Sequence, residues 1–155
     1  MNQSNIYRPI RAKVEKVIEE NPTIRTIVLK PEEEFSFQAG QFAFVTVAGV
    51  GEAPFTPSSS PSRKERVDFT VMKTGVVTEA IHRLQEGDTV GIRGPYGRPY
   101  PLKKFEGREI LLVGGGVGLA PLRSLFYALM ENVSRYQRVL FCCGAKTPRD
   151  YLYKD

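Results

Sequence analysis

The sequence has no tryptophan, a single histidine and only two cysteines in 155 residues. The two cysteines, Cys142 and Cys143, are adjacent in a predicted strand, so their side chains point to opposite faces and are poorly placed to form a disulfide. Two cysteines also cannot hold a [2Fe–2S] cluster, which needs four protein ligands. This scarcity of cysteine leads us to expect a reduced, cytoplasmic setting.

Long apolar runs are missing too: none approaches the roughly 18 residues of a membrane span, and the first residues lack the apolar core of a secretion signal. The histidine, His82, is expected on the exposed side of a short helix. Serines 58–60 have no histidine base nearby, which argues against nucleophilic catalysis. The net charge of +5 is spread along the chain. It suits an anionic cofactor or an acidic partner and gives little support to nucleic-acid binding.

What is present in the first two-thirds is a series of short segments rich in Val, Ile and Thr, separated by Gly and Pro. One helical segment interrupts them, with Val77, Ile81 and Leu84 at helical spacing and Gly87 as its stop. Such a series indicates an antiparallel barrel or sandwich. We predict strands at Arg11–Glu20, Thr23–Lys30, Gly40–Gly49, Arg66–Lys73 and Asp88–Gly94.

The pattern changes beyond Lys103–Arg108, where we place a boundary between units 1–104 and 105–155. A near-continuous apolar strand from Glu109 leads into a helix over about Ala120–Asn132 and then a second strand, which is the pattern of a parallel unit. The helix carries an apolar stripe of Leu122, Leu125, Phe126, Leu129 and Met130.

The second strand, Arg138–Ala145, is the last one in the sequence, although a doubly wound sheet usually has five or six strands. We therefore expect an exposed apolar edge on this strand or its neighbour. We also expect that the sequence is a fragment or that another chain completes the fold.

A glycine cluster joins the apolar strand to the helix that follows. Backbone N–H groups and the positive end of the helix converge there, which makes a site for a phosphate or pyrophosphate. Pro121 fits the start of the helix, because N–H groups in the first turn have no intrahelical partner. A tight turn without a ligand is the alternative; we favour the dinucleotide site. The candidate residues are Gly115, Gly116, Val117, Gly118, Leu119 and Pro121.

Residues 116–121 have the form G-x-G-x-x-P, and with them the chain resembles the ferredoxin–NADP reductase superfamily. It is most similar to NAD(P)H-linked electron-transfer subunits, such as the gamma subunits of sulfhydrogenases and the electron-transfer subunit of dihydroorotate dehydrogenase. The resemblance runs from about Arg8 to Asp155. It implies an antiparallel Greek-key flavin-binding β-barrel at 1–104, followed at 105–155 by the first part of a parallel-sheet NAD(P)-binding domain.

The resemblance implies two stretches that bind FAD. In the first, Phe55 would cover a face of the flavin ring and Thr56 would hydrogen-bond the flavin N5, while Ala53 replaces an arginine that would meet the pyrophosphate. In the second, the first turn of the short helix would hold the FAD pyrophosphate, and Lys73 would partly replace the missing cation. The implied contacts are Pro54, Phe55, Thr56, Val71, Met72, Lys73, Gly75, Val76, Val77 and Thr78.

Cys143 and Gly144 resemble the family's Cys-Gly pair near the nicotinamide, which makes Cys143, with Thr56, a catalytic candidate. From the residues alone, Cys143 reads as a small core residue. Lys146 and Arg149 favour the 2′-phosphate of NADP.

The function implied by the resemblance is that of an FAD-dependent oxidoreductase. It would transfer hydride between NAD(P)H and flavin and pass electrons to an iron–sulfur protein or subunit in a hetero-oligomeric complex. The alternatives are a non-catalytic flavin-binding or docking module and a barrel that serves only as an interaction domain.

Overall fold

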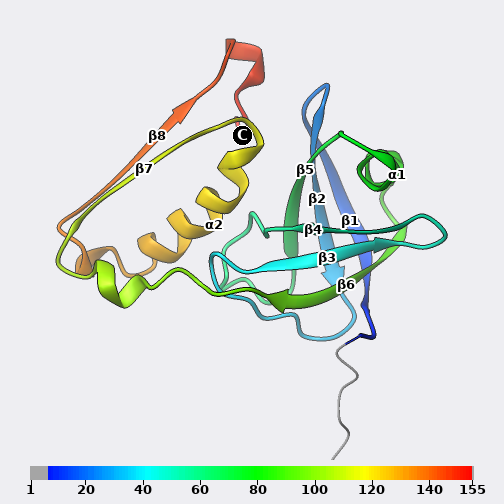
Figure 1. Ribbon diagram of the computed structural model, residues 1–155, viewed down its shortest axis with the longest axis horizontal. Helices are drawn as coiled ribbons and strands as arrows, with labels where there is room; N and C mark the ends of the chain where they lie inside the picture. The colour runs from blue at the N-terminus through cyan, green and yellow to red at the C-terminus, as the bar shows by residue number, and fades with distance from the viewer. Residues whose placement is uncertain (1–6, 155) are drawn as a thin grey trace, which may run out of the picture.

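The computed structural model describes residues 7–154 and has two parts (Figure 1). The first part is a six-stranded antiparallel sheet curled into a barrel, with the strand order β4-β3-β6-β1-β2-β5. This confirms the antiparallel barrel expected from the strand pattern. Its elements are β1 (Ile10–Asn21), β2 (Ile24–Pro31), β3 (Phe42–Val47), β4 (Gly51–Phe55), β5 (Val67–Met72), α1 (Val76–Arg83) and β6 (Thr89–Tyr96).

The barrel interior is filled by alternate residues of each strand. In β3, Ala43 and Val45 are fully buried, whereas Phe42 and Phe44 lie half-buried on the outside. In β5, Val67, Phe69 and Val71 point inward, each at most 1% exposed. This alternation is what a strand with one face on the core requires.

The barrel has an opening between β4 and β5, the two strands at the ends of the sheet. Pro57, just after β4, forms an isolated β-bridge with Phe69 of β5. Helix α1 contacts both β4 and β5 and therefore lies across the opening. We call this opening the seam. It includes the end of β4 at Phe55, the end of β5 at Met72 and the start of α1 at Val76.

Strand β4 is not among the strands predicted from the sequence, and it contains a proline, Pro54. Proline lacks the N–H that a central strand would use, but it is tolerated on an edge strand. Within residues 7–154, β4 is such an edge: it pairs only with β3, and Pro54 lies opposite Phe44.

Two expectations about the short helix were wrong. α1 ends at Arg83, and Gly87 lies beyond it in a turn, where its N–H donates to the carbonyl oxygen of Val14 at 2.8 Å. His82 is not on an exposed face but only 8% exposed, because the helix lies against β5 and buries both Ile81 and His82.

The second part is a parallel strand–helix–strand unit, as predicted. Strands β7 and β8 pair in parallel from Glu109 opposite Arg138 to Gly115 opposite Gly144. Helix α2 packs on one face of this sheet, with Leu125 and Leu129 buried, whereas Met130 at its end is 43% exposed rather than part of the buried stripe. The elements are η1 (Leu102–Phe105), β7 (Glu109–Gly115), η2 (Gly116–Gly118), α2 (Leu119–Met130), η3 (Val133–Arg135), β8 (Arg138–Gly144) and η4 (Pro148–Asp150).

The opposite face of the two-stranded sheet exposes apolar side chains. Leu111 is 61% and Val113 66% exposed, and Leu140, paired with Leu111, is 39% exposed. The exposed apolar surface is thus a sheet face and not only the edge that the sequence suggested. Among residues 7–154, no helix is long and apolar enough to cross a membrane.

Candidate functional site

The glycine turn lies at the carboxyl end of β7, where the chain passes through η2 into α2. Gly116 has φ +54°, a left-handed conformation that glycine adopts without steric cost. Gly118 is the N-cap of α2, so Pro121 falls in the first helical turn, where its missing N–H breaks no helical bond. The N–H of Leu119 already donates to the carbonyl oxygens of Gly116 and Val117. The N–H groups open to an anion are therefore those at the start of η2, at Gly116–Gly118, next to the positive end of the helix.

The glycines of this turn serve different purposes. A Cβ on Gly114 would collide with Cδ1 of Leu122, and a Cβ on Gly115 would lie 2.7 Å from the carbonyl oxygen of Gly144. These two glycines allow the helix and the neighbouring strand to approach. Gly116 and Gly118, by contrast, would have nothing within 4 Å of a Cβ. Open space next to free N–H groups is what an incoming phosphate requires.

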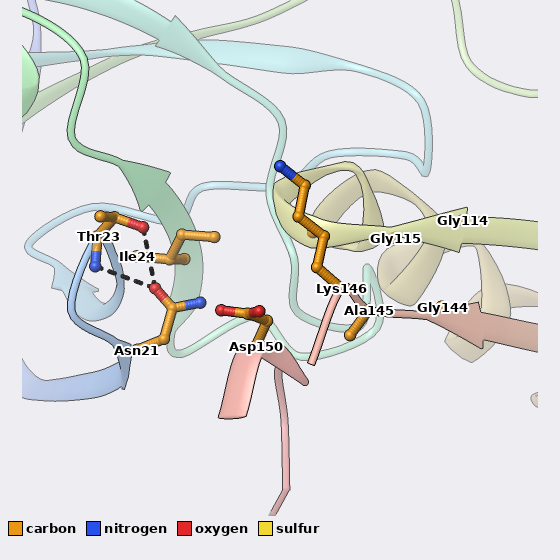
Figure 2. Close-up of a pocket in the computed structure, with 10 residues that line it drawn as sticks. Asn21, Thr23, Ile24, Gly114, Gly115, Gly144, Ala145, Lys146 and Asp150 are labelled. Carbon is orange, nitrogen blue, oxygen red and sulfur yellow. Dashed lines mark hydrogen bonds between the residues drawn. The ribbon is translucent and has the colours of Figure 1, made fainter. Parts of the chain in front are cut away.

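A pocket of about 650 Å³ opens at this turn, between the second unit and the barrel (Figure 2). Its size is that of a small-molecule site. The barrel contributes the turn between β1 and β2, and the second unit contributes the ends of β7 and β8 and the segment after β8. The lining residues are Asn21, Thr23, Ile24, Gly114, Gly115, Gly116, Gly144, Ala145, Lys146 and Asp150.

The polar side chains around the pocket include Asn21 and Asp150, both held in place by local hydrogen bonds. Oδ1 of Asn21 accepts from the backbone N–H and the hydroxyl of Thr23, at 3.0 and 3.1 Å. Oδ2 of Asp150 accepts from the N–H and hydroxyl of Thr147, at 3.1 and 2.8 Å. Sequence reasoning missed both as site residues: Asn21 indicated only a turn, and Thr23 is the first residue of the predicted strand Thr23–Lys30.

The residues predicted to bind flavin at the ends of β4 and β5 lie around the seam, but their side chains differ in exposure. Phe55 is half-buried and packs against the barrel core, and Thr56 follows it, also half-buried. The side chain of Val71 is fully buried, and its carbonyl oxygen lies 2.8 Å from Nε2 of His82. Met72, 40% exposed, and Lys73, exposed, face solvent beyond it.

The first turn of α1 forms a compact cap at the seam. The hydroxyl of Thr78 accepts from the N–H groups of Thr74 and Gly75 and donates to the carbonyl oxygen of Gly75, all at 2.8 Å. The N–H groups of Val76 and Val77 point out of the helix start without an intrahelical partner. A Cβ on Gly75 would have nothing within 4 Å, so space is open beside them.

Apolar surface and a helix start lie together at the seam. Met72 is 40% and Val76 75% exposed, so both side chains present apolar surface to solvent. The N–H groups of a helix start suit an anion. Lys73 is exposed nearby, and it is the cation closest in sequence to this helix start.

Ala53 stands where the resemblance implies an arginine, and Arg93 does not supply that missing cation. In the row across β4, β3 and β6, Ala53 lies beside Val45 and Ile92, whose side chains fill the barrel. Arg93 is one residue further along β6, so it points to the outer face, where it pairs with Glu52 and lies 4.5 Å over the ring of Phe44. Its guanidinium lowers the pKa of the Glu52 carboxyl.

Cys143 and Thr56 do not line the pocket at the glycine turn. Cys143 is exposed and lies opposite Gly114 in the sheet. By strand alternation it shares a face with Phe141, which packs in the same core cluster as α2, while Cys142 shares the bare face with Leu140.

An antiparallel barrel with an open seam, followed by a parallel unit with a glycine turn, is the fold of flavin- and nucleotide-dependent reductases. Residues 10–100 match the family of oxidoreductase FAD-binding domains. The chain belongs to this family, and the resemblance to the ferredoxin–NADP reductase superfamily is thereby confirmed.

Curated relatives point the same way. The gamma subunit of sulfhydrogenase 1 from Pyrococcus furiosus is 40% identical over 158 residues, covering 99% of this chain and 54% of the relative. A probable dihydroorotate dehydrogenase B (NAD(+)) electron transfer subunit from Methanocaldococcus jannaschii is 36% identical over 149 residues, covering 96% of this chain and 52% of the relative. The chain thus spans about half the length of these curated relatives.

Solved structures share the fold. A cytochrome P450 reductase from Amycolatopsis superposes with a TM-score of 0.80 at 28% identity, covering 95% of this chain and 46% of that one. The ferredoxin–NADP+ reductase of Plasmodium falciparum superposes with a TM-score of 0.78 at 16% identity, covering 99% and 65%. The second likeness shows the fold alone.

Proposed function

We propose that this protein is an FAD-dependent oxidoreductase that transfers hydride between NAD(P)H and FAD and passes the electrons to an iron–sulfur partner or subunit. The observation that carries the proposal is the pocket between the glycine turn and the barrel, on a chain of the FAD-binding family. In this proposal 1–104 is the FAD-binding unit and 105–155 the start of the NAD(P)-binding unit. Residues 1–6 and 155 of these ranges lie outside the described residues.

The residues of the chain would bind and orient the two ligands. The free N–H groups of Val76 and Val77 and the Lys73 amine would hold the FAD pyrophosphate at the seam. The glycine turn, Gly115–Pro121, would hold the pyrophosphate of the nicotinamide nucleotide. When bound, FAD supplies a ring that accepts a hydride at N5 and releases electrons singly or in pairs.

Two residues are proposed to act near the reacting rings. Thr56 follows β4 at the seam, where its hydroxyl would donate to the flavin N5. Cys143 would lie beside the nicotinamide, and its support is its exposure and its position next to Gly144, which lines the pocket. Thr56→Val and Cys143→Ala should each slow flavin reduction while flavin content stays unchanged. A variant that reacts at the wild-type rate removes its residue from the proposal.

The choice between NADH and NADPH would depend on Lys146 and Asp150, which both line the pocket, whereas Arg149, the other predicted cation, does not line it. An ammonium group favours a 2′-phosphate, and a carboxylate favours the ribose hydroxyls of NAD. Since the structure brings both to the pocket, each nucleotide has to be tested. The names of the relatives, a gamma subunit and an electron transfer subunit, support a place in a hetero-oligomeric complex. A cytoplasmic location is part of the proposal.

The proposal is tested by the visible absorption spectrum of the protein with FAD, recorded before and after anaerobic addition of NADH and then NADPH. We expect a flavin band that bleaches with at least one nucleotide. A retained band that neither nucleotide bleaches would favour the second candidate, a non-catalytic flavin-binding or docking module. Folded protein that retains no flavin would overturn both.

A further inference from the structure

Arg123, on α2, reaches out of the second unit and contacts the barrel. Its Nη1 donates to the carbonyl oxygen of Ser58 at 3.2 Å and lies 3.6 Å from Oδ2 of Asp68 in β5. The side chain of Arg123 is 25% exposed and that of Asp68 only 7%. Because water is largely excluded from this contact, the attraction between the charges is stronger than at an open surface.

Both barrel partners of Arg123 belong to the segments that form the seam. Ser58 comes two residues after Thr56, and Asp68 lies three residues before Val71. The N–H of Ser58 donates to the carbonyl oxygen of Asp68 at 2.8 Å, and the N–H of Asp68 donates to the hydroxyl of Ser59 at 3.1 Å. The segment after β4 is therefore bonded to β5, and Arg123 contacts both sides at once.

The other end of the connection is the glycine turn. Arg123 lies five residues after Gly118, which places it about 7.5 Å along the axis of α2 from the turn. An α-helix is stiff over this length. Because the guanidinium of Arg123 is bound to the barrel, it also sets the position of the glycine turn relative to the seam.

Two tyrosines hold the guanidinium in its orientation. Its carbon lies 4.4 Å from the ring centre of Tyr153 and 5.2 Å from that of Tyr127. Tyr153 is itself tied to the barrel: its hydroxyl donates to Thr70 Oγ1 and its N–H donates to a Glu20 carboxylate oxygen, both at 2.8 Å. A planar, delocalised cation suits two aromatic neighbours and a carboxylate, and lysine does not reproduce this set of contacts.

A second contact on the same side of α2 limits rotation of the helix. Residues 123, 127 and 131 share one helical face. At the end of this face, the carboxylate of Glu131 accepts from the hydroxyl of Ser60 at 2.6 Å and from that of Ser62 at 2.5 Å. α2 is thus bound to the segment after β4 at two points, with Arg123 nearer the glycine turn.

We propose that Arg123 is a positioning residue for hydride transfer, which sets the distance between the nicotinamide held by the glycine turn and the flavin held at the seam. The inference rests on the proposed function. Rates of transfer between two bound groups are sensitive to displacements of about 1 Å, which can change the rate by about a hundredfold. Arg123 touches neither ligand in this account and acts through the two elements that it joins.

The test compares Arg123→Met with Arg123→Lys and with a matched control, Arg63→Met, in the complete flavin-loaded protein. Arg63 also faces the Asp68 carboxylate, at 3.5 Å, but it lies on the barrel. Its loss therefore removes a cation from the same carboxylate while the link to α2 stays. The limiting rate of flavin reduction at saturating NAD(P)H, the nucleotide dissociation constant and the long-wavelength charge-transfer absorbance between nicotinamide and flavin are measured.

For Arg123→Met we expect a limiting rate lowered about tenfold or more and a weakened charge-transfer band, with flavin content and nucleotide affinity within about twofold of wild type. The limiting rate of Arg123→Lys should lie between those of wild type and Arg123→Met. Arg123→Lys also tests the proposal if Arg123→Met does not fold. Arg63→Met should keep the wild-type rate and band even where its melting temperature drops.

Equal rates in wild type and both Arg123 variants would overturn the inference and leave the proposed function standing. So would equal losses of rate in Arg123→Met and Arg63→Met, because these would reflect stability alone. Wild-type protein whose flavin is not bleached by either nucleotide overturns the proposed function and this inference together.

Discussion

A side chain on Gly115 would meet the backbone of Gly144: its Cβ would lie 2.7 Å from the Gly144 carbonyl oxygen in the neighbouring strand. Such a separation is too short for any real Cβ contact, so either the strands would move apart or the backbone would distort. Gly115 is therefore required by the pairing of β7 and β8. Gly118, three residues later, has φ −63° and open space around it, so packing does not require glycine there.

Substitutions at these two glycines should affect stability and nucleotide binding separately. Gly115→Ala is expected to lower the free energy of unfolding by about 1–3 kcal/mol through overpacking. Gly118→Ala should change it by less than about 1 kcal/mol, but its methyl group would stand at the helix start and weaken nucleotide binding about tenfold. Denaturant unfolding and nucleotide titration measure the two effects. Unchanged nucleotide affinity in Gly118→Ala would exclude the glycine turn as the phosphate site.

Thr78 should support both α1 and FAD binding, because its hydroxyl makes the three hydrogen bonds that shape the first turn. Thr78→Val keeps the shape but loses these bonds, and we expect a loss of about 1 kcal/mol in unfolding free energy. FAD affinity should fall about fivefold, since the turn no longer holds its N–H groups in place. Thr78→Ser retains the hydroxyl and is the control; a Ser variant as weak as the Val variant would contradict the cap as the cause.

His82 joins α1 to β5 through Nε2, which lies 2.8 Å from the carbonyl oxygen of Val71. Because a carbonyl only accepts, the imidazole must carry a proton on Nε2. His82→Ala removes this hydrogen bond and leaves space where a buried ring packed, so it should cost about 1–3 kcal/mol of unfolding free energy. His82→Gln, which offers an amide donor, should recover part of this loss. Denaturant unfolding of the three proteins measures both, and an Ala variant as stable as wild type would show that the contact contributes nothing.

Asp68 should give the stability a distinct pH dependence. Burial raises the pKa of its carboxyl, and the guanidiniums of Arg63 and Arg123 only partly offset this. The unfolded chain therefore loses this proton at a lower pH than the folded chain, and between the two pKa values the folded state binds more protons. The contribution of Asp68 to stability is thus present below its ordinary pKa of about 3.9 and is lost as the pH rises through the raised value.

The direction of this pH dependence is measured by denaturant unfolding of wild type and Asp68→Asn at acidic to neutral pH. We expect the unfolding free energy of wild type minus that of the variant to fall as the pH rises. A difference that grows with pH would mean that the two guanidiniums outweigh burial and lower the pKa of the carboxyl.

Most elements could be predicted from the sequence because their signals are local. The alternation in Phe42–Val47 and the apolar run of β7 indicate strands whatever the rest of the chain does. β4 escaped prediction because the tolerance of Pro54 depends on its strand being an edge, which is a property of the assembled sheet. His82 was misplaced for a related reason: which faces of α1 are buried depends on how the helix lies against β5.

The sequence by itself determined most of the strands and helices and, through Gly116–Pro121, the place where a phosphate can meet a helix start. Only the tertiary structure decided what surrounds that place. Asn21 and Thr23 line the pocket although they lie far from the glycine turn in the sequence. Arg123 contacts Asp68, which lies 55 residues earlier in the sequence. Local propensity acts over a few residues, whereas these contacts arise when the barrel and the parallel unit bury their surfaces against each other.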